Sequence, residues 1–148
     1  MFLKNEHHIV RYCNPATVDH ISGKITSKAF ELKPKFKRGK RKPEKYLSAN
    51  WIEKYSNNII ESMKKILLDF KRKRYTVKKN GRFALLNVGE IIRHVRENTQ
   101  GKFNLSVKTR CNLFDKSHCG IFGYSIKNNN HIPGLILDKL KDTLPAEY

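Results

Sequence analysis

The sequence predicts an α+β fold, a single domain in which a small mixed or antiparallel sheet is packed by about three helices. A chain of 148 residues is long enough for one domain with its own core. Segments rich in β-forming residues and segments with helical apolar spacing follow one another in an irregular order. An irregular order is typical of α+β proteins rather than of parallel α/β sheets.

Two strands are predicted in the N-terminal part, at 8–13 and 24–32. The first, HIVRYC, is rich in β-forming residues, and the second, KITSKAFEL, places Ile25, Ser27 and Ala29 on one face. The DHISG phrase between them predicts a turn. The short segment 46–51, YLSANW, is expected to dock onto the core.

The clearest predicted element is a helix over 58–74. Its apolar residues recur at helical spacing and are expected to face the sheet: Ile59, Ile60, Met63, Ile66, Leu67 and Phe70. Asn58 with Glu61 predicts a capping box at its start, and Asn87 with Glu90 predicts another. A buried strand is expected at 82–88, followed by a second helix whose apolar stripe is formed by Val88, Ile91, Ile92 and Val95.

Three further elements are predicted towards the C-terminus. The alternating segment 103–110 predicts a strand, and 112–123 predicts a loop that leads into a short apolar strand. Pro133 suits the first turn of a last helix, in which Leu135, Ile136, Leu140 and Leu144 would face inward.

The formal net charge of +18 is unevenly distributed. Residues 1–80 hold 21 Lys and Arg against 7 acids, a net of +14, whereas residues 81–148 hold 10 against 6, a net of +4. Abundant Lys and Asn are also typical of AT-rich genomes, yet the surplus exceeds what solubility needs. A partner with dense negative charge is indicated: nucleic acid first, then an acidic protein, then anionic lipid.

Two basic clusters carry this surplus, KPKFKRGKRKP at 33–43 and KRKRYTVKK at 71–79. The first predicts a flexible, solvated insertion at 33–45, bracketed by Pro34 and Pro43, which discourage regular structure. It either contacts phosphates or is a solvated loop without a specific partner. The predicted phosphate contacts are Lys35, Lys37, Arg38, Lys40, Arg41, Lys42, Lys71, Arg72, Lys73, Arg74, Lys78 and Lys79. Phe36, Tyr46 and Tyr75 either stack on bases or simply pack.

The sequence contains none of the usual nucleic-acid-binding modules, and Walker, dinucleotide and nucleophile-elbow patterns are absent, so no cofactor is expected. No stretch is long and apolar enough for a membrane span, and the N-terminus does not resemble a signal peptide. Three cysteines without framework spacing indicate a reduced, cytoplasmic protein.

His118 is the main candidate for chemistry. With Asp115 and a basic surface it could act as a general base in phosphodiester cleavage, with Arg11 and 48–50 in the same pocket. The alternative is a histidine that only hydrogen-bonds its own loop. Cys111, Asp115, His118 and Cys119 form the one metal-like group, but a second ligand pair is missing, so no metal is expected and the cysteines are expected to be buried.

Several short phrases resemble a group of small, largely uncharacterised bacterial proteins of mobile-element or anti-phage gene clusters. These phrases are the Arg-containing strand IVRYC, TSKAF, YLSAN and DKSHCGIFG, which has Cys119 where the group usually has Ala. The resemblance implies an accessory member of such a cluster. It marks, without assigning a reaction, Arg11, Ser27, Phe30, Ser48, Asp115, His118 and Gly123.

The leading hypothesis is therefore a basic nucleic-acid-binding accessory subunit of a larger bacterial complex, such as one of anti-phage defence. The ligand is DNA or RNA, and a larger protein partner is expected. One alternative is a small nuclease or nucleotide-modifying toxin that uses His118 and Arg11. The other is an adaptor that binds an acidic protein. The lack of a second clear acid, base or metal pair near His118 favours a binding protein over an enzyme.

Overall fold

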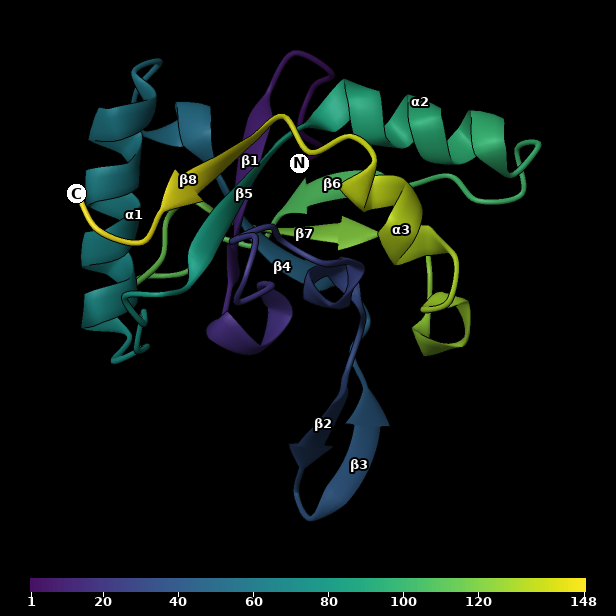
Figure 1. The fold of residues 1–148 in the computed structure, drawn as a ribbon, viewed down its shortest axis with the longest axis horizontal. Helices are drawn as coiled ribbons and strands as arrows, with labels where there is room; N and C mark the ends of the chain where they lie inside the picture. Colours follow the sequence, from purple (N-terminus) through teal and green to yellow (C-terminus); the bar gives the residue numbers. More distant parts are fainter.

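A six-stranded antiparallel sheet forms the centre of the domain. The computed structural model describes residues 1–148, apart from the side chains of Phe36 and Lys37. The strands follow the order β6-β7-β4-β1-β5-β8 (Figure 1). Their bounds are β1 His8–Cys13, β4 Leu47–Trp51, β5 Arg82–Asn87, β6 Ser106–Thr109, β7 His118–Phe122 and β8 Asp142–Pro145. The predicted α+β class is confirmed.

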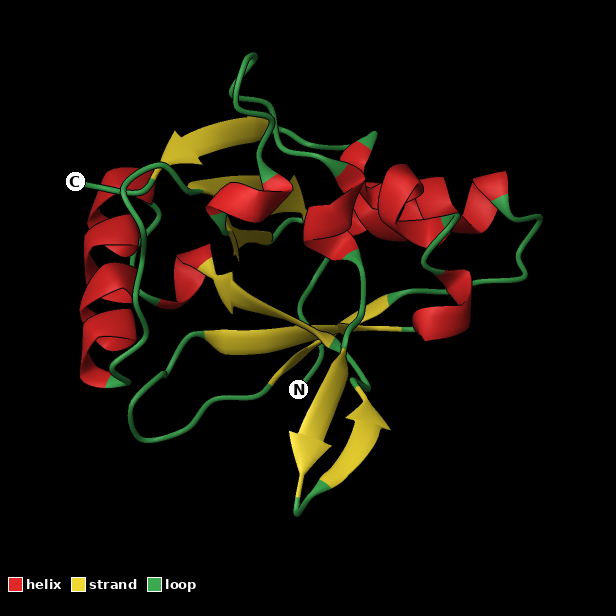
Figure 2. Ribbon diagram, turned by 60° about the horizontal axis from the view of Figure 1, so that its bottom comes forward, coloured by secondary structure: helices red, strands yellow, loops and turns green.

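Helices cover both faces of this sheet. On one face, α1 (Ile59–Arg72) packs Met63, Ile66 and Phe70 against side chains of β1 and β5. On the other face, α2 (Val88–Asn98), α3 (Ile132–Leu137) and the short 3₁₀ helix η2 (Ser27–Phe30) enclose the larger core. Figures 1 and 2 show α1 on one side of the sheet and α2 with α3 on the other. Because successive residues of a strand point to opposite faces, each strand contributes to both cores.

Asparagine side chains fix the starts of the two long helices. The Oδ1 atom of Asn58 accepts the backbone N–H of Glu61 at 3.0 Å, and that of Asn87 accepts the N–H of Glu90 at 2.9 Å. Both predicted N-caps are therefore present. The carboxylate of Glu61 accepts from the Ser56 hydroxyl, so the reciprocal half of its capping box is replaced by a different contact.

Two sequence predictions were wrong because the local apolar pattern was compatible with more than one kind of secondary structure. Segment 24–32 forms η2 and a single bridge between Val18 and Ile25 rather than a strand. The last helix ends at Leu137, and the residues beyond it form β8 along β5. Leu144 therefore reaches the core from a strand, opposite Phe83.

The basic run at 33–43 also differs from its prediction. It forms a separate two-stranded hairpin, β2 (Pro34–Lys37) and β3 (Lys40–Pro43). Arg38 and Gly39 at the turn have φ of 52° and 72°. Positive φ at both central residues is the mark of a type I′ turn, whose twist matches that of the flanking strands. The hairpin projects away from the domain (Figures 1 and 2).

Segment 46–51 was predicted to dock onto the core, but it forms β4 in the middle of the sheet. The predicted strands at 8–13, 82–88 and 103–110 are present as β1, β5 and β6 within a few residues. Among the residues that the structure describes, no helix combines the length and the apolar character needed to cross a membrane.

The buried face of α1 is narrower than its apolar spacing predicts. Ile60 is 56% exposed, and Leu67 is only partly buried, whereas Ile66 is fully buried. Ile60 lies in the first turn and on the solvent side. We therefore expect Ile66→Ala to lower the free energy of unfolding by about 2–5 kcal/mol, because it leaves a cavity. Ile60→Ala, the matched control, should cost less than about 1 kcal/mol.

Chemical denaturation of the two variants measures this difference. Equal losses for Ile66→Ala and Ile60→Ala would contradict the packing of α1 described above.

Candidate functional site

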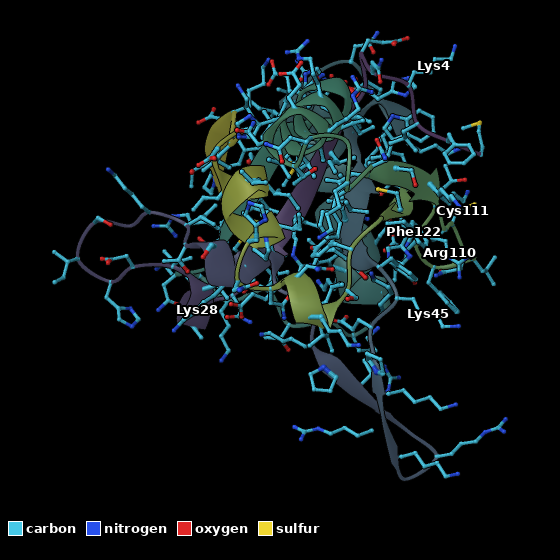
Figure 3. The ribbon with its side chains drawn as sticks, turned by 90° about the vertical axis from the view of Figure 1, so that its right-hand side faces the viewer. Lys4, Lys28, Lys45, Arg110, Cys111 and Phe122 are labelled. Carbon is cyan, nitrogen blue, oxygen red and sulfur yellow. The ribbon has the colours of Figure 1, made fainter. Side chains whose placement is uncertain are left out.

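In the hairpin β2–β3, every side chain that the structure describes is exposed. The residues from Arg38 to Lys42 are all exposed, and Lys35 lies directly opposite Lys42 in the register. Like charges opposite each other in a sheet are destabilising, and an isolated two-stranded hairpin is marginal in water. Lys35 makes one ion pair, to Glu44 at 3.7 Å near the base of the hairpin. In Figure 3, the side chains drawn on the hairpin point into solvent.

The second basic segment, 71–79, begins with the last residues of α1. Arg74 adopts a left-handed conformation with φ of 58°, and the N–H of Tyr75 bonds back to the carbonyl of Phe70. This closure ends the helix in a Schellman-type turn. Lys71, Arg72, Arg74, Lys78 and Lys79 are exposed. Two of the six cations face acids: Arg72 lies 3.6 Å from Asp69, and Lys73 bonds to Asp115.

A cavity of about 180 Å³ lies between this segment and β4, the strand that follows the hairpin. Its walls come from β1, from β4, from the end of α1 with the chain beyond it, and from the first residue of β7. The lining residues are Arg11, Tyr12, Asn14, Ser48, Asn50, Phe70, Lys73, Tyr75 and His118. We call this cavity the Arg11 pocket.

Arg11 supplies a guanidinium group without a counter-ion. Its Nε donates to the carbonyl of Ala29 at 2.6 Å, and its Nη1 donates to the carbonyl of Ser48 at 2.7 Å. It forms no ion pair with any described carboxylate. Burial lowers the pKa of Arg11, since desolvation disfavours the charged form, but a guanidinium remains protonated at neutral pH. The pocket therefore contains a positive charge that no described carboxylate pairs with directly, although the charge of Glu44 acts on it from a distance.

His118 lines the same pocket and keeps one ring nitrogen as an acceptor. Its Nδ1 lies 3.1 Å from the carbonyl oxygen of Arg110. Because a carbonyl only accepts, Nδ1 carries the hydrogen, and Nε2 of the neutral ring keeps its lone pair. Burial lowers the pKa of His118, and the positive charges of Lys73 and Arg110 act in the same direction, whereas the Arg110 carbonyl and Asp115 oppose them. The imidazole is therefore neutral at pH 7.

The ring of His118 is held in place by its neighbours. Asn50 pairs with His118 in the register between β4 and β7, and the ring of Tyr46 packs 6.1 Å from the imidazole. Tyr46 in turn lies under the guanidinium of Arg110, at 5.2 Å. Arg110 is labelled in Figure 3, on the same side of the domain as Lys45 at the base of the hairpin.

Asp115 makes no hydrogen bond to the imidazole of His118 among the described residues. It is fully buried; its Oδ1 accepts from Nδ2 of Asn50 at 2.9 Å, and its Oδ2 accepts from Nζ of Lys73 at 2.5 Å. Asn50 also donates to the hydroxyl of Ser117. The role of Asp115 is thus to fix two of the pocket's side chains, and its charge acts on His118 without a hydrogen bond between them in the described structure.

The cysteines do not join His118. Cys119 is buried in the larger core, because its side chain points to the sheet face opposite that of its neighbour His118. Cys13 is buried as expected, but Cys111 is exposed, so its predicted burial is wrong. Throughout the described part of the chain, no cluster of three His, Cys, Asp or Glu side chains has the arrangement of a metal site.

The aromatic residues singled out in the sequence have different positions. Tyr75 is 53% exposed and lines the Arg11 pocket, while Tyr46 packs against His118 and Phe122. Tyr46 is therefore a packing residue. The predictions for Phe36 as a stacking residue and Lys37 as a phosphate contact concern side chains outside the described residues.

The fold thus brings Arg11, Ser48, Asn50 and His118 to one cavity, as the sequence suggested it could. Sequence reasoning assigned Lys73 only to the surface cluster and missed Tyr12 and Asn14 as lining residues. Lys73 directly follows the amphipathic helix α1, and this position could have indicated that its side chain lies close to the sheet that the helix covers. Of the other residues marked by the resemblance, Phe30 is fully buried in the core, and Gly123 has φ of 120°.

Comparison of the chain with models of protein families, with curated proteins and with solved structures finds no match.

The buried network around Asp115 gives a direct stability prediction. Asp115→Asn removes the charge that holds Lys73 and places an amide where Asn50 donates. We expect a loss of about 2–4 kcal/mol in the free energy of unfolding. Asp138→Asn is the matched control, because Asp138 is 58% exposed and pairs with His94 at the surface. Its cost should stay below about 1 kcal/mol.

Thermal and chemical denaturation report both values. If Asp115→Asn is as mild as Asp138→Asn, the network does not support the pocket.

Proposed function

We propose that this protein binds nucleic acid, with the hairpin β2–β3 and the segment 71–79 contacting the phosphate backbone. The observation that carries the proposal is a projecting hairpin whose strands place cations opposite one another and whose described side chains are all exposed. Self-repulsion of this kind disfavours the free hairpin. A polyanion removes that cost, because each bound phosphate neutralises a cation and releases condensed counterions.

A two-stranded hairpin is a form of backbone that suits a nucleic-acid groove. A two-stranded ribbon is one of the elements that the major groove of duplex DNA admits, and ribbons also enter the minor groove in architectural proteins. The hairpin leaves the domain beside β4, so the body of the protein, with segment 71–79, remains outside a groove that the hairpin enters. Contacts of this type bind without reading sequence.

The proposal extends to the cellular setting. Three free cysteines are compatible with a reducing compartment, and we place the protein in the cytoplasm on that basis. A role as the accessory subunit of a larger complex, such as an anti-phage system, is part of the same proposal. An adaptor for an acidic protein is the competing function, and the binding measurement below separates the two.

The test compares two variants of equal charge. The hairpin variant combines Arg38→Ser, Lys40→Ser, Arg41→Ser and Lys42→Ser. The control variant removes four exposed lysines elsewhere through Lys24→Ser, Lys28→Ser, Lys102→Ser and Lys127→Ser. Affinity for duplex DNA, single-stranded DNA and RNA of one sequence is measured over a salt titration.

We expect the hairpin variant to bind more weakly to every nucleic acid that the parent binds. For duplex DNA, the slope of log K against log salt should become shallower by up to about 3.6, from four lost phosphate contacts at about 0.9 each. The control variant should change the slope much less, and neither variant should change the melting temperature. A parent protein that binds none of the three nucleic acids at low salt would rule out the proposal and favour the adaptor.

A further inference from the structure

The Arg11 pocket combines two kinds of group that rarely suit the same ligand atom. Arg11 and Lys73 are hydrogen-bond donors with positive charge. His118 is a neutral ring whose Nε2 lone pair has no partner among the described residues, because its one hydrogen bond is made by Nδ1. An anionic oxygen suits the cations but is repelled by the lone pair. The lone pair needs a ligand group that donates a proton, such as a hydroxyl.

The size of the pocket limits the ligand further. A cavity of about 180 Å³ is smaller than the roughly 300–1,000 Å³ typical of pockets for drug-sized ligands. It suits a small unit with an anionic group and a hydroxyl side by side. In RNA, the 2′-hydroxyl lies next to the 3′-phosphodiester, and DNA lacks that hydroxyl. The pocket chemistry therefore selects RNA from the nucleic acids of the proposed function.

We propose that the Arg11 pocket cleaves RNA, with His118 as the general base. This inference rests on the proposed function, since the surrounding basic surface brings the strand to the pocket. Nε2 of His118 accepts the proton of the 2′-hydroxyl, and the 2′-oxygen attacks the adjacent phosphorus. The bond between phosphorus and the 5′-oxygen of the next nucleotide breaks. That oxygen takes a proton from solvent water, and the remaining hydroxide takes the proton from His118.

The products are a 2′,3′-cyclic phosphate and a 5′-hydroxyl, so the step consumes no oxidant, reductant or net water. Charge builds up on the phosphoryl oxygens in the transition state, where fixed cations are most effective. Arg11 is held by two backbone carbonyls and Lys73 by Asp115, so both are oriented before the strand arrives. The sequence lacked a second group near His118, and the fold supplies these two cations from distant segments.

The pH dependence follows from the groups that face His118. These are Arg11 on β1, Lys73 after α1, Arg110 after β6, Asp115 before β7, and the ring of Tyr46. The base is active when neutral, so cleavage should rise as the pH increases through the His118 pKa. Because that pKa lies below its ordinary value near 6.5, the rate should already be level at pH 7.

The experiment uses the full-length protein with a short single-stranded RNA of mixed sequence, labelled at its 5′ end. The same oligonucleotide with 2′-O-methyl groups serves as a substrate that can bind but has no 2′-proton to lose. Binding and cleavage are measured in the same samples, in EDTA, for the parent, His118→Gln and His20→Gln. His20 is exposed in a distant turn and is the matched control.

We expect the parent and His20→Gln to cut the RNA and leave cyclic phosphate ends, and to bind the 2′-O-methyl strand without cutting it. His118→Gln should lose about 100-fold or more in rate while it still binds RNA. If RNA is bound but not cut between pH 5 and pH 8, the cleavage proposal is wrong, while the proposed nucleic-acid binding is unaffected. Equal rates for His118→Gln and the parent, or cutting of the 2′-O-methyl strand, also overturn the cleavage proposal. If the protein does not bind RNA, the cleavage proposal is wrong, and RNA is not a ligand of the proposed function.

Discussion

The arrangement of this domain depends on the guanidinium group of Arg11, which lies where the pairing between β1 and β4 ends. β1 pairs with β5 at six positions but with β4 at only two, Ile9 with Trp51 and Val10 with Asn50. Beyond them Arg11 spans the separation, donating to carbonyls of η2 and β4. A buried charge is costly unless it is hydrogen-bonded and neutralised. Arg11 has the hydrogen bonds but no carboxylate, so the opening between the strands becomes an anion-binding pocket.

A second buried group connects this opening to the rest of the fold. Asp115, just before β7, binds Lys73 at the end of α1 and Asn50 on β4. Through these bonds one carboxylate ties the helix to two strands and orients two pocket side chains. The hairpin has the opposite design, since its cations are exposed and held by few contacts. The rigid pocket and the exposed hairpin thus suit different tasks, local recognition of one phosphate unit and general attraction of a polyanion.

The sequence predicted those parts of the fold that depend on local pattern. α1, α2, β1 and β5 follow from apolar spacing and from caps at Asn58 and Asn87. The hairpin was missed because its strands carry charges in place of alternating apolar residues, and the Arg38–Gly39 turn lacks the usual Asn-Gly signal. β8 was missed because Leu140 and Leu144 continue a helical stripe that tertiary pairing with β5 overrides. For the site, residue types identified Arg11 and His118, but only the tertiary fold brings Lys73 to them.

An NMR titration of the protein with inorganic phosphate, observed at the side-chain nitrogens, tests most directly whether the Arg11 pocket binds an anion. If Arg11 awaits an anion, its Nε–H signal and the Nε2 signal of His118 should shift together and saturate, and Arg11→Lys should abolish the saturable shift at His118. The fixed fork of a guanidinium, which binds two phosphate oxygens, is lost in lysine. Shifts confined to exposed lysines, with Arg11 and His118 unaffected at high phosphate, would contradict the existence of an anion site in this pocket.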